Sequence, residues 1–507
     1  MDRWLINAPR WLLLGTLVYA PWAYGTTPLW AVDILNILLA ICLGLWVVTC
    51  LLRRAWPSVH PVPAVLMLAL LAQACFMIFN ARYNYDSVAH EFIPLNPFLS
   101  WGAGSLHREL SIQTTLQVAA MLGALALSCD MARHREWRAR LLLTIAATGA
   151  SIALLGLMQK FTHASAIFWG SEDMGNAFFA TYRYHGNAGA FLNVIWPIVA
   201  GFAAVAFLRP SSNDRLRVTW TIALVICLAA VFVNTSRAAG ALGLVLAVLG
   251  GGWILWQMVR GRLAGFSAPV AAITGLILLG FVAVIAAMAG LDTSLKRWGR
   301  FGLEVNERNP RLLATMVCLD MVPQAGCMGF GPGTFQTTFP YFTERFGNKL
   351  RGRWLYAHQD YLQTQIEWGY VGGVLWGLLV FGGILYSMHR AWRHRASLTI
   401  STQITHRAIL FAWLGVLLHA LVDFPMQIAS IQLYLMAMLG LLWGSKHWLK
   451  RDPRGAPPAS RSHSSGRRSR HRGRGEHAES ESGRPDRGAG VTVAPSTAET
   501  LALSPQP

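Results

Sequence analysis

Three basic side chains lie where they could bind a phosphorylated substrate and move a proton. His358 precedes an apolar run, and an imidazole at the mouth of a membrane helix can accept a proton near neutral pH. Arg311 follows Asn309-Pro310, a pair typical of a helix start, whose free N–H groups favour an anion. We expect this helix to end before Pro323. Arg237 lies between two apolar runs, where a charge is costly and marks function. These residues predict a cationic site for phosphate.

Each of the three residues also has a structural interpretation. Arg311 can be a solvated loop arginine, and Arg237 can extend its guanidinium group to the lipid headgroups. An isolated histidine is more often structural than catalytic. We expect His358 to open a helix that continues into the apolar run at Trp368. Position in the sequence leaves both interpretations open for all three residues.

Weaker candidates surround these residues in the sequence. Arg183 and His185 precede a small-residue segment in an earlier polar loop. His419 and Asp423 are four residues apart and share one helix face, where a structural bond is favoured over a catalytic pair. The cluster Gly329-Phe330-Gly331-Pro332-Gly333 predicts a tight turn, which is favoured over a phosphate cradle.

The polar loop shows no sequence pattern typical of a metal or cofactor site. Its carboxylates are scattered and lack the close aspartate pairs of a magnesium-dependent sugar-nucleotide enzyme; they are Asp292, Glu304, Glu307, Asp320, Glu344, Asp360 and Glu367. We therefore expect neither a metal nor a cofactor. Cys318 and Cys327 share this loop, but a disulfide between them is not the favoured interpretation, because spacing cannot fix their geometry.

The composition predicts an all-α, polytopic membrane bundle that positions these groups. The 507 residues are 54% hydrophobic and only 13% charged, which is too apolar for an ordinary soluble protein of this size. A membrane span needs about 20 mostly apolar residues. About twelve candidates follow from this: 11–24, 30–52, 62–80, 114–131, 141–159, 186–208, 218–234, 238–258, 268–290, 368–388, 408–424 and 426–443. The first has no cleavage site and is interpreted as a retained anchor.

The distribution of arginines predicts the orientation of these spans. Arginine clusters fall in every second connection, namely at 53–54, 133–140, 209–217, 260–262 and 390–395. With twelve spans, both termini are expected in the cytoplasm. The opposite connections, 81–113, 160–185, the turn at Ser236 and the long loop 291–367, are then extracytoplasmic.

The chain divides into a membrane domain and a tail. We expect residues 1–450 to form the transmembrane domain, with 291–367 as its extracytoplasmic catalytic loop. Much of the net charge of +19 lies after Lys450 among Ser, Gly and Pro residues. Residues 451–507 cannot bury a core and are predicted to be a disordered cytoplasmic extension. We expect this tail to contact anionic membrane lipids, and not nucleic acid, because no folded module supports RNA binding.

Taken in order, these motifs resemble those of the O-antigen ligase/polymerase superfamily. The resemblance covers about 182–443 and rests on Ser236-Arg237, the Arg311 helix, the Gly329–Phe335 segment, the Ala357–Gln363 block with Glu367, Gly369 and Gly372, and the His419–Phe424 segment. Two features depart from the family pattern. Gln359 stands where an asparagine commonly follows the histidine, and the Arg/Ser-rich tail has no counterpart.

The resemblance implies a metal-independent, inverting transfer of a glycan at the bacterial inner membrane. The donor would be a glycan on a polyprenyl (undecaprenyl) diphosphate carrier, and the acceptor a hydroxyl of a lipid or polysaccharide, commonly a lipid A core. Arg237 and Arg311 would then bind the diphosphate, with Arg183 as a third contact. His358 would act on the acceptor with Asp360 and Tyr361 in support. His419 and Asp423 would belong to the substrate-binding set.

Other functions remain open from the sequence. A polymerase that joins repeat units on the carrier, or an oligosaccharyltransferase acting on protein hydroxyls, would show the same motifs. A transporter or lipid flippase is a different class that twelve spans permit. A transporter usually lines its route with polar groups at mid-membrane, whereas the basic groups of this chain cluster at one face.

Overall fold

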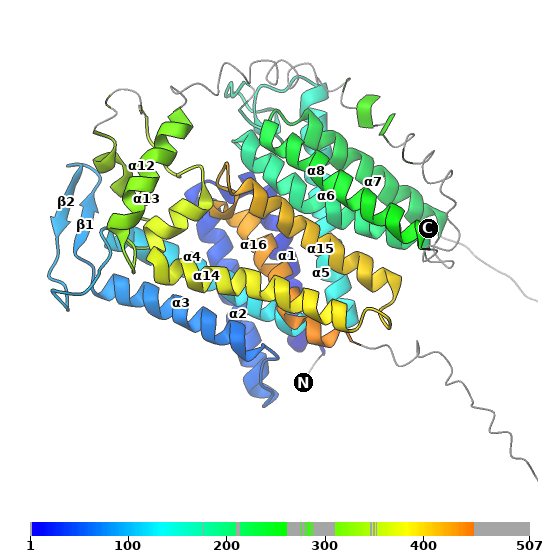
Figure 1. Cartoon of the computed structure of the whole chain (residues 1–507), viewed down its shortest axis with the longest axis horizontal. Helices are drawn as coiled ribbons and strands as arrows, with labels where there is room; N and C mark the ends of the chain where they lie inside the picture. The colour runs from blue at the N-terminus through cyan, green and yellow to red at the C-terminus, as the bar shows by residue number, and fades with distance from the viewer. Residues whose placement is uncertain are drawn as a thin grey trace, which may run out of the picture. The chain divides into compact units, whose positions relative to one another are not determined.

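The computed structural model shows a bundle of long helices with a group of shorter elements at one end (Figure 1). It describes residues 3–175, 177–208, 213–260, 275, 279–280, 282–284, 287, 310–344, 347, 350 and 352–450, all within one compact unit, Met1–Ala456. The tail 451–507, most of the expected span 268–290 and residues 291–309 lie outside the described residues.

The long helices are α1 (Arg3–Trp22), α2 (Leu29–Leu52), α3 (Pro61–Phe79), α4 (Arg108–Met131), α5 (Arg135–Phe161), α6 (His185–Leu208), α7 (Asp214–Val233), α8 (Arg237–Val259), α12 (Pro310–Ala325), α14 (Asp360–Arg393), α15 (Ile400–His419) and α16 (Ala429–Trp443). Shorter helical turns are α13 (Phe335–Thr338), η1 (Tyr24–Thr26), η2 (Ile167–Trp169), η3 (Phe339–Phe342), η5 (Pro425–Gln427) and η6 (Gly444–His447). The one sheet among the described residues pairs β1 (Tyr83–Asp86) with β2 (Glu91–Pro94).

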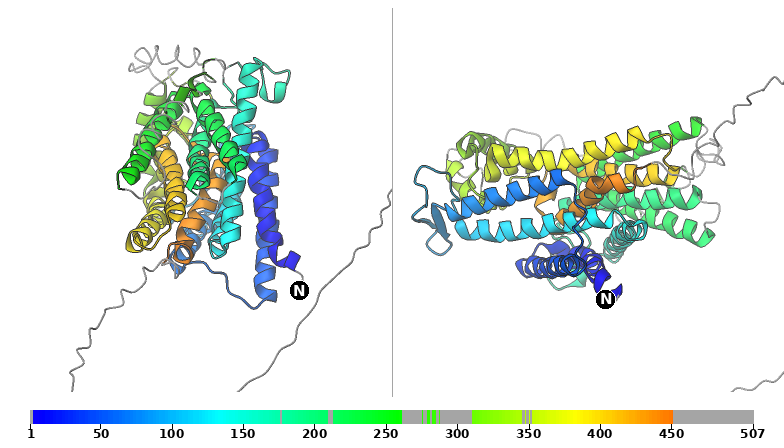
Figure 2. Two further views of the ribbon diagram at one scale, coloured as in Figure 1. Left: turned by 90° about the vertical axis from the view of Figure 1, so that its right-hand side faces the viewer. Right: turned by 90° about the horizontal axis from the view of Figure 1, so that it is seen from below.

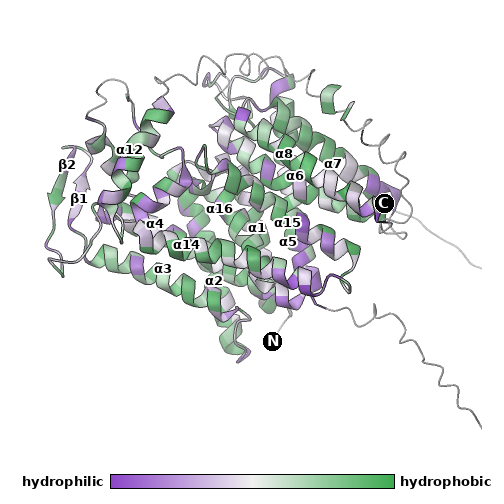
Figure 3. Ribbon diagram, viewed as in Figure 1, coloured by the Kyte–Doolittle hydropathy of each residue, from purple (hydrophilic) through white to green (hydrophobic). Residues whose placement is uncertain are grey.

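Eight described helices, α2 to α8 and α14, are long and apolar enough to cross a membrane. Figure 3 shows α2 and α3 as largely hydrophobic along their length. The multi-pass helical architecture is therefore confirmed. The expected spans at 11–24, 408–424 and 426–443 form helices but do not reach this length and hydropathy; α16, for example, has only 15 residues. The number twelve stays a prediction.

The expectation of an all-α chain is wrong at the connection 81–113, which contains the β1/β2 hairpin. The Asp86 side chain accepts hydrogen bonds from the backbone N–H groups two and three residues later, which stabilises the turn that reverses the chain. Phe92 packs on Tyr341 with ring centroids 5.1 Å apart. The hairpin is thus anchored to the segment that follows α12.

The core of the bundle is centred on α16 and α6. Every residue of α16 except Gln432 is buried, as expected for a helix that is hydrophobic all round, and it packs against α1, α4 and α14. Helix α6 packs against α5, α7, α8 and α15. The two views in Figure 2 show these helices side by side along much of their length.

The connections between the long helices lie at two opposite ends of the bundle, according to the direction in which each helix runs. One end, the loop end, holds the connections between α3 and α4, α5 and α6, α7 and α8, and α15 and α16, together with the segment before α14. Backbone contacts join them: the Leu106 N–H donates to the Phe330 carbonyl at 2.9 Å, and the Asp360 N–H donates to the Ala420 carbonyl at 3.0 Å. The other end, the arginine end, holds the opposite connections. These are the two groups that the arginine pattern separates.

Two expected helix boundaries are wrong. Helix α12 begins at Pro310 as expected, but Pro323 lies inside it and the helix ends at Ala325. A proline near the last turn removes only one intrahelical bond, so the helix can continue past it. The second boundary is the start of α14, which lies at Asp360 and not at His358.

Candidate active site

His358 and Asp423 form the centre of the candidate site at the loop end. The imidazole Nδ1 lies 3.0 Å from Asp423 Oδ1, and the two side chains are 22% and 4% exposed. His358 immediately precedes the N-cap of α14, and Asp423 lies in the turn after α15. Contacts between two elements 65 residues apart in sequence therefore fix the position of the imidazole.

Two further side chains extend this pair into a network. The Tyr184 hydroxyl donates to the second carboxylate oxygen of Asp423 at 2.9 Å. Arg311 Nη2 in turn donates to the Tyr184 hydroxyl at 2.8 Å. Arg311 lies in the first turn of α12, as the sequence predicts, and Tyr184 directly precedes α6. The network thus joins the ends of four helices.

The charges of this network are fixed by its contacts. Burial acts to raise the pKa of Asp423, but the hydrogen bond from His358 and the nearby His419 and Arg311 outweigh it, so this pKa lies below its ordinary value. Burial and the adjacent Asp423 carboxylate raise the pKa of the Tyr184 phenol. Asp423 is therefore ionised and Tyr184 protonated at neutral pH. Because a carboxylate only accepts, the hydrogen bond between them places a proton on His358 Nδ1 and leaves Nε2 directed away from Asp423.

The backbone of His358 is strained. Its φ angle is +52°, a left-handed conformation that non-glycine residues adopt rarely. The neighbours hold it there: the Ala357 N–H donates to the Gln363 side chain at 3.0 Å, and the Gln359 side chain caps α14 by accepting from the Leu362 N–H. Gln359 thus performs a local structural role in place of the family's asparagine. Strain of this kind is a marker of functional positions.

Asp360 and Tyr361 position the site and do not join its network. Asp360 accepts hydrogen bonds from the Met426 N–H at 2.8 Å and the Gln427 amide at 3.0 Å. The Tyr361 hydroxyl donates to the Leu417 carbonyl at 2.8 Å. These three bonds tie the start of α14 to the end of α15 and the segment that follows it. Their expected support of His358 in the reaction and their contact with substrate both stay predictions.

The glycine cluster forms a structural turn, as the sequence analysis favours. Gly329, Gly331 and Gly333 all have positive φ angles, and a Cβ on Gly329 would lie 2.3 Å from the Glu367 carbonyl oxygen. The N–H groups of this turn are used internally: those of Gly333 and Phe335 donate to the Glu367 carboxylate at 3.1 and 3.4 Å. The turn therefore braces the kink of α14 at Gly369, where φ is +64°.

The structural bond between His419 and Asp423 is a backbone one, in which the Asp423 N–H donates to the His419 carbonyl at 3.0 Å, and their side chains share no hydrogen bond. His419 Nε2 lies 4.0 Å from Asp423 Oδ2, which is too long for a hydrogen bond. The carboxylate instead bonds His358 and Tyr184, which approach it from other elements. The His419 side chain is completely buried, and neither ring nitrogen has a hydrogen-bond partner.

Arg237 lies in a neighbouring turn at the same end. It is half-buried and is the first residue of α8, where the Ser236 hydroxyl accepts from the Ala239 N–H at 3.3 Å. The preceding Asn234 amide donates to the His185 carbonyl at 2.9 Å. Because Tyr184 directly precedes His185, the structure brings the Arg237 turn against the segment that carries the network.

Arg183 is the predicted cation that the structure does not bring into the network. Its guanidinium group lies 3.8 Å from Glu172 Oε2, and both side chains are more than half exposed. The pair crosses the loop between α5 and α6. Arg183 adds positive charge beside Tyr184 without bonding Asp423 or Arg311 in the described contacts.

Aromatic rings surround His358. Phe424 packs edge-on against the imidazole with centroids 4.7 Å apart, and Trp354 does so at 5.7 Å. Tyr356 stacks on Phe424 at 4.5 Å and Tyr184 stacks on Phe424 at 5.5 Å. The rings exclude water from one side of the imidazole and orient it.

Tyr184 and Trp354 are the site residues that the sequence analysis missed. Tyr184 lies between Arg183 and His185, both of which were singled out, but it is 127 residues from Arg311 and 239 from Asp423. No spacing rule connects positions so far apart.

The structure contains no group of three or more metal-ligating side chains among the residues it describes. Within the same residues, Cys318 and Cys327 are free thiols.

Comparison with known proteins identifies the family of this region. The family model described as O-antigen ligase matches residues 222–377, a range that includes Arg237, Arg311 and His358. No curated protein matches the chain. The resemblance inferred from the motifs is thus confirmed over 222–377, and the chain contains an O-antigen ligase domain.

Proposed function

We propose that this chain, a glycosyltransferase-type membrane enzyme of the O-antigen ligase family that acts in surface polysaccharide biosynthesis, transfers a glycan from a polyprenyl diphosphate carrier to an acceptor hydroxyl. The family implies a lipid-linked glycan as substrate. The observation that carries the proposal is the network in which Asp423 orients His358 and connects it through Tyr184 to Arg311.

His358 is the proposed base for the acceptor. Nδ1–H donates to Asp423, so Nε2 is the nitrogen that accepts the proton when the imidazole acts as a base. The acceptor oxygen attacks the anomeric carbon as its proton moves to Nε2, and the ionised Asp423 stabilises the imidazolium that forms. A positioned base of this kind contributes on the order of 10²- to 10⁴-fold to the rate. A single displacement inverts the anomeric configuration.

Arg311 and Arg237 are the proposed contacts of the leaving group. The bond between the anomeric carbon and the phosphate oxygen breaks, and the electron pair remains on the polyprenyl diphosphate. This anion is stable without protonation, so it needs positive charge and not a general acid. Arg311 lies at the free N–H groups of the first turn of α12 and Arg237 at those of α8, where charge and helix dipole act together. No metal is required in this proposal.

The same network also sets the relative position of donor and acceptor. Arg311 bonds Tyr184, Tyr184 bonds Asp423, and Asp423 bonds His358 at 2.8 to 3.0 Å. A guanidinium group for the diphosphate is thus held at a fixed separation from the base for the acceptor. Such positioning is a main source of rate enhancement in two-substrate reactions.

The proposed setting is the bacterial inner membrane, with both termini cytoplasmic and the loop end extracytoplasmic. The arginine clusters at the opposite end support this orientation. The polyprenyl chain would then lie in the outer leaflet beside the loop end, and the acceptor would approach from the extracytoplasmic side.

Reconstitution tests the proposed reaction. The purified full chain is placed in liposomes with a polyprenyl-diphosphate-linked oligosaccharide, and release of polyprenyl diphosphate is measured with and without a lipid A core acceptor. We expect acceptor-dependent release that is lost in His358→Ala. The matched control is His60→Ala, since His60 lies at the arginine end, where its ring packs on Tyr386 and Trp443.

The products distinguish the open alternatives. Glycan on the lipid A core identifies a ligase, longer glycan on the carrier identifies a polymerase, and glycan on added protein identifies an oligosaccharyltransferase. Movement of the intact carrier lipid across the bilayer without cleavage would contradict the proposal and favour a flippase.

A further inference from the structure

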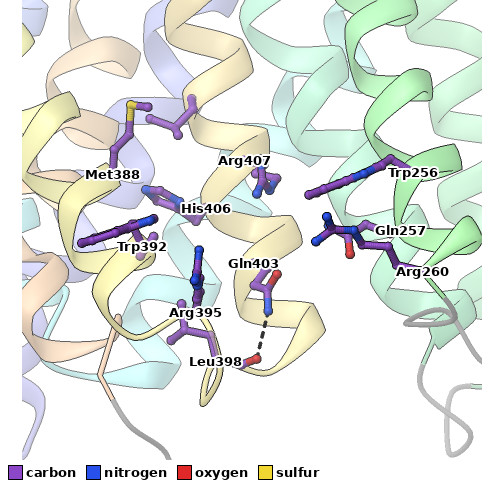
Figure 4. Close-up of a pocket in the computed structure, with 12 residues that line it drawn as sticks. Trp256, Gln257, Arg260, Met388, Trp392, Arg395, Leu398, Gln403, His406 and Arg407 are labelled. Atoms are coloured by element: carbon purple, nitrogen blue, oxygen red, sulfur yellow. Dashed lines mark hydrogen bonds between the residues drawn. The ribbon is translucent and has the colours of Figure 1, made fainter.

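A second cavity lies at the arginine end, far from His358. It has a volume of about 630 Å³ and is lined by residues from the end of α8, the end of α14 and the start of α15. Figure 4 shows Arg260 approaching from α8, Arg407 from α15 and Arg395 from the connection between α14 and α15. Helix α15 spans 20 residues, roughly 30 Å at about 1.5 Å per residue. The cavity is therefore separate from the candidate active site.

Each arginine of this cavity stacks on a tryptophan. The guanidinium carbon of Arg260 lies 3.9 Å from the Trp256 ring centroid. The corresponding distances are 4.5 Å from Arg407 to Trp253 and 5.8 Å from Arg395 to Trp392. Stacking holds a guanidinium group through its face and leaves its in-plane N–H donors available.

The described residues that line this cavity include no acidic side chain to balance these charges. None of its lining residues is an aspartate or glutamate, and within the described part of the chain the three guanidinium groups have neither an ion pair nor a side-chain hydrogen bond. This differs from other arginines at the same end, such as Arg10 and Arg133, which both contact Asp130. Three converging positive charges without a counter-ion favour an anion.

A buried amide supplies an independent observation. Gln257 lines the cavity and is only 1% exposed, yet neither its side-chain nitrogen nor its oxygen has a hydrogen-bond partner. A buried polar group without a partner is costly, so native structures usually satisfy it with a protein group, water or a ligand. A bound anion would accept from the Gln257 amide.

The remaining lining indicates what carries the anion. Met388, Leu398 and Leu410 form an apolar part of the wall, beside the cationic part. A free inorganic ion would use only the cationic part, whereas a lipid headgroup with the start of its acyl chain would use both.

We propose that this cavity binds the phosphate group of an anionic ligand, which a phospholipid headgroup or a free phosphate could present. The site is independent of the proposed glycan transfer, because its evidence comes from other residues at the opposite end. Arg260, Arg395 and Arg407 surround the phosphate oxygens, and Gln257 donates to them from the cavity wall.

Binding of radiolabelled phosphatidylglycerol to the full chain in neutral detergent tests this site. We expect saturable binding that exceeds binding of phosphatidylcholine, and at least a roughly tenfold loss of affinity in Arg395→Gln/Arg407→Gln. The matched control is Arg53→Gln/Arg393→Gln, which removes the same charge from exposed positions at this end outside the cavity. We expect less than about a threefold change in the control.

Competition by inorganic phosphate distinguishes the two sources. Displacement of the lipid at millimolar phosphate identifies a site for the phosphate group alone, and its failure identifies a site for the whole headgroup. Equal losses in the two double variants, or equal binding of the two lipids, would overturn the proposal. Thermal unfolding without lipid verifies that both variants fold, and Arg395→Lys/Arg407→Lys should restore part of the affinity.

Discussion

The two ends of the bundle use arginine in opposite ways. At the loop end, Arg311 donates to Tyr184, which donates to Asp423, the residue that also accepts from His358. At the arginine end, Arg260, Arg395 and Arg407 stack on tryptophans and line a cavity without a carboxylate. The first arrangement fixes the positions of its members, and the second leaves donors for a ligand.

This difference indicates what each end can do. A base must be held in one orientation with one nitrogen unprotonated, which requires a buried carboxylate such as Asp423. An anion site requires only uncompensated positive charge and some exclusion of water. The loop end is therefore suited to chemistry and the arginine end to binding.

The largest expected effect is the loss of transfer in His358→Ala. Removing the base should lower the rate about 10²- to 10⁴-fold. The measurement is the initial rate of polyprenyl diphosphate release in proteoliposomes. A rate near that of the wild type would show that His358 has no chemical role, and the proposed difference in function between the two ends would be wrong.

The next largest effect is expected for Arg311→Gln. Loss of a preorganised charge that stabilises the leaving group should lower the rate roughly 10²- to 10³-fold. Arg183→Gln is the control, because Arg183 is exposed and contacts Glu172 outside the network. Transfer should be measured over a range of donor concentrations. Equal effects of the two substitutions would mean that only the net positive charge of the loop end matters.

A smaller effect is expected for Tyr184→Phe. This substitution removes the hydroxyl between Arg311 and Asp423 and leaves the ring that stacks on Phe424. Both hydrogen bonds of this hydroxyl are to charged groups, which are worth about 1.5–3 kcal/mol, so the rate should fall about ten- to a hundredfold. Tyr361→Phe is the comparison, since its hydroxyl bonds a backbone carbonyl. It should lower the unfolding temperature more than the rate, and the reverse result would contradict the assignment.

The smallest expected effect is that of salt on lipid affinity at the arginine end, compared with its effect on the transfer rate at the loop end. Raising the ionic strength from about 0.1 to 1 M shortens the Debye length from roughly 10 to 3 Å. Affinity of the arginine end for phosphatidylglycerol should therefore fall a few-fold, whereas single-turnover transfer, which depends on direct hydrogen bonds to the buried Asp423, should change little. Both are measured on the same preparation. A larger effect of salt on the transfer rate than on lipid affinity would contradict the proposed difference between the two ends.

The sequence predicts the membrane helices and the functional segments better than their contacts. Apolar length locates the helices, because a span needs a continuous apolar run, and the arginine pattern separates the two ends. Local motifs identify Arg237, Arg311 and His358 because each follows a helix-start or charge-burial rule.

Tertiary contacts explain what the sequence could not predict. His419 and Asp423 are spaced for a side-chain bond along one helix, but α15 ends at His419, and the Asp423 carboxylate bonds His358 and Tyr184. Tyr184 acts only through residues more than 100 positions away in sequence. The β1/β2 hairpin depends on a turn at Asp86 and on packing against Tyr341, which no periodicity indicates.

A double-mutant cycle of His358 and Asp423 tests the central claim most directly. The rate of glycan transfer is measured for His358→Ala, Asp423→Asn and the double variant. If Asp423 acts by orienting His358, the double variant should be no slower than His358→Ala alone, because the carboxylate has no function once the imidazole is absent. Losses that multiply in the double variant would contradict the account, since Asp423 and His358 would then contribute independently.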